Sequence, residues 1–69
     1  MNSTIVAVVG LFKTQSEFAR AIGVKQPSVF SWMVGKTKPS AKNAIAIERV
    51  TNGAVTRAEI RPEIFGDAA

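Results

Sequence analysis

The sequence of 69 residues contains no cysteine and no histidine. Without cysteine, neither a disulfide framework nor a thiolate metal site can hold the fold together. Without histidine, the usual zinc ligands are missing, and so are the commonest general bases and nucleophiles of enzymes. The five acidic residues are scattered and lie mostly beside arginines or at predicted helix starts. We therefore expect no catalytic residues, no metal site and no cofactor, and we interpret the chain as a protein that is not an enzyme.

Long hydrophobic runs are also missing. The run from Ile5 to Phe12 is far shorter than a membrane span, no basic residue precedes it, and no small-residue cleavage site follows it. We therefore expect a cytoplasmic protein with no membrane association. A chain of this length makes one small domain, residues 1–69, with little core to spare.

Positive charge is concentrated in one stretch of the chain. The net charge is +4, and between Lys13 and Lys42 the only acid is Glu17. The basic residues in this stretch are Lys13, Arg20, Lys25, Lys36, Lys38 and Lys42. Such a stretch suits a polyphosphate partner, although an ordinary solvated basic surface also explains it.

The segment QSEFARAIGVKQPSVFSWMV, residues 15–34, has the spacing of a DNA-binding helix-turn-helix. A small residue at Ala19 lets a second helix cross closely over the first. Gly23 falls where the first helix must end, in a turn that often needs a positive φ. Val24, Val29 and Trp32 then turn inward and bury the back of the second helix.

Helix signals surround this motif. Ile5, Val8, Val9 and Phe12 share one face at helical spacing, with Ser3 or Asn2 as a cap, although the valines also fit a strand. Thr14 and Glu17 form a predicted capping box before a helix that ends at Gly23. The next helix begins near Gln26 and stops at Gly35, with Pro27 in its first turn.

Two more helices are predicted after the motif. Ser40 caps a helix with apolar positions at Ala44, Ile45, Ile47 and Val50, and Asn52-Gly53 ends it. A second capping box, Thr56 and Glu59, predicts a short helix over Arg57–Arg61 that Pro62 breaks. We expect Ile60, Ile64 and Phe65 to fold back over the core, and the chain to fray from Gly66 onward. The predicted fold is all-α, a compact bundle of about five short helices ordered over about residues 3–65.

Two stretches together resemble a known group. The helix-turn-helix with its tryptophan is similar to the Cro-like repressors of temperate bacteriophages. The segment AIAIERVTNGAVTRAEIRPEIFGD, residues 44–67, resembles the end of the YdaS-type subgroup of small phage-derived regulators and antitoxins. The resemblance runs from Phe12 to Asp67 and implies a lambda-repressor-like fold and operator binding. The chain departs from the pattern in its almost wholly apolar first helix and in Lys13, where a glycine is common.

Carried over by position, the resemblance places Gln26, Pro27, Ser28, Phe30 and Ser31 on the surface that reads DNA bases. The Gln26 amide both donates and accepts, so it suits an adenine edge, although a solvated role in the first turn is the alternative. Ser28 and Ser31 either reach the DNA or join local capping bonds. Phe30 either rests against thymine methyl groups or packs locally over Pro27.

Other polar residues are expected to contact phosphates. Lys25, Lys36 and Lys38 flank the recognition helix, and Lys13, Thr14 and Gln15 lie at a helix start, where free N–H groups favour an anion. For Arg49, Arg57 and Arg61, ion pairing with nearby acids is a sufficient explanation.

These features predict a sequence-specific DNA-binding transcriptional regulator, a Cro-type phage or prophage repressor. Its recognition helix, Gln26 to Met33, would enter the major groove of an operator and the bound protein would block a promoter. One domain reads few base pairs, so we expect a weak homodimer or a dimer formed on DNA. The dimer surface is either the outer side of the first helix, with Val6 and Leu11, or Ile64-Phe65. The alternative is an antitoxin or antirepressor that mainly binds a protein partner, a toxin or another repressor.

Overall fold

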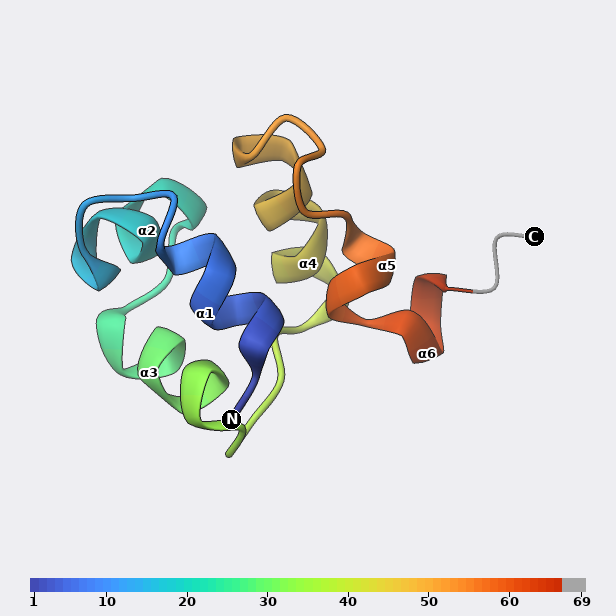
Figure 1. The fold of residues 1–69 in the computed structure, drawn as a ribbon, viewed down its shortest axis with the longest axis horizontal. Coiled ribbons are helices and arrows are strands. Elements are labelled where there is room, and N and C mark those ends of the chain that lie inside the picture. The colour runs from blue at the N-terminus through green and yellow to red at the C-terminus, as the bar shows by residue number, and fades with distance from the viewer. Residues whose placement is uncertain (67–69) are drawn as a thin grey trace. The chain divides into compact units, whose positions relative to one another are not determined.

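The computed structural model describes residues 1–66, and in that range the chain forms helices and no strand (Figure 1). The helices are α1 Ser3–Val9, α2 Gln15–Ile22, α3 Gln26–Val34, α4 Ala41–Val50, α5 Arg57–Ile60 and α6 Pro62–Phe65. The all-α prediction is confirmed. The described residues hold six helices rather than about five, because α6 was not predicted.

The chain divides into two units, Met1–Lys38 and Pro39–Ala69. The first unit contains α1, α2 and α3, and the second contains α4, α5 and α6. That all 69 residues act as one domain stays a prediction. Fraying was expected from Gly66 onward; the Gly66 N–H donates to the Pro62 carbonyl at 2.8 Å, and residues 67–69 lie outside the described part of the chain.

The core of the first unit consists of six buried residues, Ile5, Val8, Phe18, Ala19, Val29 and Trp32. Ile5 and Val8 lie on α1, so the first segment is a helix and not a strand. Its cap is Asn2 rather than Ser3, because the Asn2 side-chain oxygen accepts a hydrogen bond from the Ile5 N–H at 3.1 Å. Helix α1 ends at Val9, earlier than the apolar spacing predicted.

Two contacts hold the ends of α1 within the first unit. Phe12 lies in the turn after α1 instead of on its face, and its ring contacts the ring of Phe18 with centroids 5.2 Å apart. At the other end, the Asn2 N–H donates to the Met33 carbonyl at 2.9 Å. This bond joins the start of α1 to the last turn of α3.

The second unit begins with a capped helix, as predicted. The Ser40 hydroxyl accepts a hydrogen bond from the Asn43 N–H at 3.1 Å, and Ala44 and Ile47 are buried while Ile45 and Val50 are half-buried. After α4, Asn52 and Gly53 adopt positive φ values of 53° and 82°. The Asn52-Gly53 terminator is therefore confirmed.

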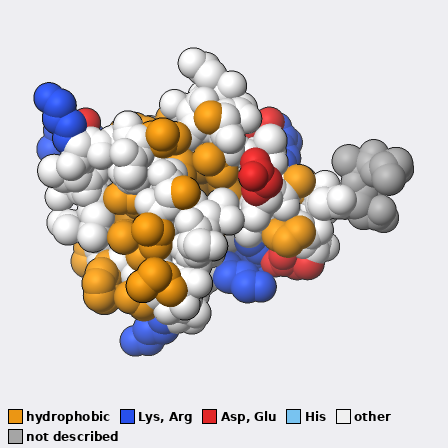
Figure 2. Space-filling model, viewed as in Figure 1, with side chains coloured by type: hydrophobic (Ala, Val, Ile, Leu, Met, Phe, Trp, Pro, Cys, Tyr) orange, Lys and Arg blue, Asp and Glu red, His pale blue; other side chains and the backbone are white. Residues whose placement is uncertain are grey.

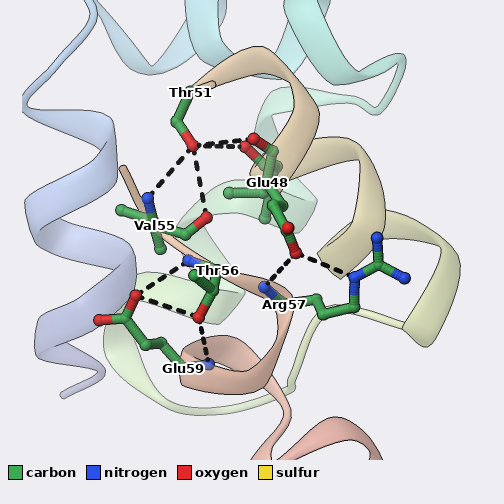
Figure 3. A network of polar contacts seen from close by, with 7 residues as sticks. Glu48, Thr51, Val55, Thr56, Arg57 and Glu59 are labelled. Carbon is green, nitrogen blue, oxygen red and sulfur yellow. Dashed lines mark hydrogen bonds and ion pairs between the residues drawn. The ribbon is translucent and has the colours of Figure 1, made fainter. Parts of the chain in front are cut away.

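A network of polar contacts fixes the connection from α4 to α5 (Figure 3). The Thr51 hydroxyl lies 2.9 Å from the Ile47 carbonyl oxygen and accepts from the Val55 N–H at 3.3 Å. Thr56 and Glu59 form the predicted capping box with both of its hydrogen bonds, at 3.2 and 2.9 Å. The segment between the two helices is thus bonded along its length.

The C-terminal part differs from the prediction. Pro62 ends α5, but it also begins the one-turn helix α6, because proline fits the first helical position, where an N–H has no helical partner. Arg61, at φ −129° and ψ 70°, interrupts the helical register between α5 and α6. Ile60 is therefore buried, whereas Ile64 is 48% exposed, contrary to the expectation that it covers the core. Phe65 is half-buried beneath the Arg57 guanidinium, 5.5 Å from the ring centroid.

Candidate nucleic-acid interface

A turn of three residues, Gly23 to Lys25, joins α2 to α3. Gly23 adopts a φ of 80°, and the N–H groups of Gly23 and Val24 donate to the carbonyls of Arg20 and Ala19 at 3.3 and 2.9 Å. This pair of bonds is a Schellman motif, which satisfies carbonyls that a helix end leaves free. Ala19 is buried, and α2 packs against α3. The predicted positive φ at Gly23 is confirmed, and Ala19 is a small buried residue of α2.

Helix α3 has a buried side and an exposed side. Val29 and Trp32 are buried, as predicted. On the opposite side, Pro27, Phe30 and Val34 are exposed at helical spacings of three and four residues, and we call them the outer stripe of α3. Phe30 is 56% exposed and Val34 43% exposed. Figure 2 shows hydrophobic side chains gathered over the region that α3 occupies in Figure 1, with a basic side chain beside them.

The polar residues predicted to read bases all lie on α3. Gln26 and Ser28 are exposed in the first turn, and Ser31 is half-buried one turn later. The N-cap Lys25 makes no side-chain capping hydrogen bond, and whether Ser28 contacts DNA or serves local capping stays a prediction. The structure thus brings Gln26, Ser28 and the outer stripe together on one helix.

Gln26 has a partner that the sequence did not reveal. The Ser16 hydroxyl of α2 donates to the Gln26 side-chain oxygen at 2.9 Å. The amide nitrogen is therefore the end of Gln26 that is turned away from Ser16. The two residues are ten positions apart, and only the packing of α2 on α3 brings them together.

The residues predicted to contact phosphates fall at both ends of α3 and before α2. Lys13 is exposed, Thr14 is the N-cap of α2, and Gln15 is its half-buried first residue. The Thr14 hydroxyl accepts from the Glu17 N–H at 3.0 Å, but in this part of the described chain the return bond from Glu17 is not formed, so the box is half made. Lys25 is the N-cap of α3, and Lys36 and Lys38 are exposed just beyond its C-cap Gly35.

The charge of the sequence is divided unequally between the two units. Residues 1–38 carry five basic side chains and one acidic side chain, whereas residues 39–69 carry four of each. The whole net charge of +4 therefore belongs to the part of the chain that contains α2 and α3. Clustered charge of this kind attracts polyanions.

Two of the arginines predicted to form ion pairs, Arg57 and Arg61, do so in the second unit. Arg57 pairs with Glu48 at 2.9 Å, and Arg61 pairs with Glu63. The Arg57 backbone N–H, followed by its guanidinium, lowers the pKa of Glu48 below the usual glutamate value. These contacts tie α5 and α6 into the second unit.

Two candidate residues were not predicted from the sequence. Val34 lies seven residues after Pro27 and four residues after Phe30, on the same side of α3. This helical spacing is the signal in the sequence that would have predicted Val34 as part of the surface. Ser16 gave no such signal, because its role depends on a contact between two helices.

The fold and this surface define a small all-helical protein whose basic unit exposes one helix between lysines. The chain matches the family model described as "Bacterial toxin YdaS" over residues 4–69, and it therefore belongs to the YdaS family. It is 47% identical over 58 residues to the Escherichia coli protein named "Putative transcriptional regulator YdaS", an alignment that covers 84% of this chain and 56% of that protein. The chain thus spans about half the length of the curated relative it matches.

No solved structure gives a significant match to the chain. Within residues 1–66, every helix is too short to cross a membrane.

Proposed function

We propose that this protein is a sequence-specific DNA-binding transcriptional regulator of the Cro type, which places α3 in the major groove of an operator and blocks a promoter. The observation that carries the proposal is the surface of α3. An exposed helix with an amide and hydroxyls at its start lies between Lys25 and Lys36, in the unit that holds all of the net positive charge. Major grooves admit one helix, and phosphates line their edges.

The comparisons support the same proposal. The relative in Escherichia coli is named as a transcriptional regulator, and the aligned part includes most of this chain. The proposal concerns only the aligned part of that longer protein. A single domain of this kind covers few base pairs, so we propose that two copies bind half-sites about 34 Å apart, as a weak homodimer or a dimer formed on DNA.

Each candidate residue has a proposed role. Gln26, Pro27, Ser28, Phe30 and Ser31 face the bases, with Gln26 as the main reader of an adenine edge. Lys13, Thr14, Gln15, Lys25, Lys36 and Lys38 contact phosphates, which hold the register without reading sequence.

Two substitutions test these roles. Gln26→Ala is expected to reduce the preference for the best-bound sequence over a scrambled one by about 1–3 kcal/mol, the value of one good base contact. Lys36→Ala is expected to weaken binding to both sequences alike and to reduce the salt slope by about 1. Lys42→Ala, an exposed lysine on α4, is the matched control and leaves both quantities unchanged. If neither Gln26→Ala nor Lys36→Ala changes binding relative to this control, the proposal is refuted.

A second candidate is an antitoxin or antirepressor; the toxin in the family description suggests a protein partner but does not make this candidate better supported than the first. Leu11 is 62% exposed and offers an apolar surface for such a partner. On this reading, Gln26→Ala and Lys36→Ala preserve function, whereas changes at Val6, Leu11 or Phe65 abolish it.

A further inference from the structure

We infer that the outer stripe of α3 reads thymine methyl groups, so that the operator half-site is A·T-rich opposite α3. The inference rests on the proposed function and names the chemistry of its target. Its starting point is an exposed aromatic ring. Phe30 leaves 56% of its surface in solvent and Val34 leaves 43%, in a chain too small to have apolar side chains to spare.

The side chains of α3 fit some base pairs and not others. The helix QPSVFSWMV contains no charged residue. Guanine is read most often by arginine or lysine, adenine by asparagine or glutamine, and thymine by apolar contact with its methyl group. With one amide and an apolar stripe, α3 carries the groups for A·T pairs and lacks the usual group for guanine.

The hydrogen bond from Ser16 orients the Gln26 side chain for contact with adenine. Because the Gln26 oxygen accepts from Ser16 at 2.9 Å, the amide NH₂ is directed outward, where it can donate to the N7 acceptor of adenine. The oxygen retains a second lone pair for the adenine N6–H. Ser16 is thus a positioning residue for Gln26.

The lysines at the two ends of α3 identify the occupant of the stripe as nucleic acid. Lys25 precedes the helix and Lys36 follows it, and both are exposed. An apolar protein surface would form no ion pair with these two cations. A major groove supplies methyl groups on its floor and phosphates along its edges, which matches an apolar stripe between two cations.

Uracil substitution tests the inference, because uracil lacks only the thymine methyl group. A duplex selected by the full-length protein from a random-sequence pool is resynthesised with uracil in place of each thymine in turn. At contacted positions the wild-type protein should bind about fourfold more weakly, the effect of losing one buried methyl-sized group. Phe30→Ala should bind the thymine duplex more weakly and no longer distinguish it from the uracil duplex at one of these positions. Lys42→Ala, which truncates an exposed side chain on α4 outside the proposed contact surfaces, should keep the full difference.

The outcomes separate this inference from the proposed function. If the pool yields no preferred sequence, the regulator proposal falls and the inference falls with it. If a sequence is preferred but no uracil substitution weakens binding, only the inference is overturned. A full thymine-to-uracil difference in a folded Phe30→Ala protein would also overturn it, because the methyl group would then be read by another residue.

Discussion

Gly23 determines, as a single residue, how the chain passes from α2 to α3. Its φ of 80° lies in the left-handed region, and its N–H donates to the Arg20 carbonyl at 3.3 Å. A Cβ atom at Gly23 would meet nothing within 4 Å. The cost of a side chain at this position therefore comes from the backbone conformation alone.

We expect Gly23→Ala to lower the free energy of unfolding by about 1 kcal/mol, the typical penalty of a left-handed conformation for an L-residue. Gly23→Asn should lose less, since asparagine tolerates this conformation. Urea denaturation followed by circular dichroism measures both. Equal losses for alanine and asparagine would show that the backbone conformation is not the cause.

Residues whose partners lie within four positions were predictable from the sequence. Thr14, Ser40 and Thr56 cap helices as expected, because a cap needs only a hydroxyl and an N–H three residues later. The return bond from the Thr14 N–H to the Glu17 carboxylate was predicted and is not formed, although the equally exposed Glu59 makes the corresponding bond to Thr56. Ser16 was missed because its partner Gln26 lies ten residues away.

At the scale of helices, the attachment of α5 to α4 depends on the Glu48 carboxylate. Its carboxylate accepts the Arg57 backbone N–H at 2.8 Å and the Arg57 side-chain N–H at 2.9 Å (Figure 3). Both bonds favour the charged carboxylate and lower its pKa. This carboxylate therefore stabilises the folded state above the ordinary glutamate pKa of about 4.3, and the contribution is lost as the pH falls through the lowered value.

The expected result is a free energy of unfolding that decreases on acidification below about pH 5 in the wild type and decreases less in Glu48→Gln. Arg57→Ala keeps the backbone N–H, which is the largest cause of the lowered pKa, and should retain part of the dependence. Denaturant titrations at a series of pH values measure it. The same acid slope in wild type and Glu48→Gln would contradict the assignment.

The helices marked by caps and apolar periodicity were predicted, and α6 was not. α2, α3 and α4 begin and end close to the expected residues because caps, glycines and apolar spacing agree. α6 was not predicted, because a proline such as Pro62 is compatible both with the end of one helix and with the start of another. The exposure of Ile64 follows from that break and was not visible in the apolar pattern.

For the whole molecule, the separation of charge is the main feature. The unit of α1, α2 and α3 holds the net charge of +4, and the other unit is neutral by count. The DNA-reading role of this unit remains a proposal, since base contacts depend on a docking angle that neither sequence nor fold alone determines. The positive charge itself predicts how binding depends on salt.

If four to six phosphates are neutralised, the logarithm of the binding constant should fall with the logarithm of salt concentration at a slope of about −4 to −5. Titrations at several salt concentrations give this slope directly. A slope near zero would show that the lysines around α3 do not contact phosphates.

The most direct test of the account is fluorescence anisotropy of the purified protein on DNA from around its own gene, with scrambled duplex as competitor. At about 150 mM salt, where purely electrostatic binding is suppressed, the account predicts at least about thousandfold tighter binding to the native sequence. Equally weak binding to both duplexes would contradict a sequence-reading regulator and direct attention to a protein partner.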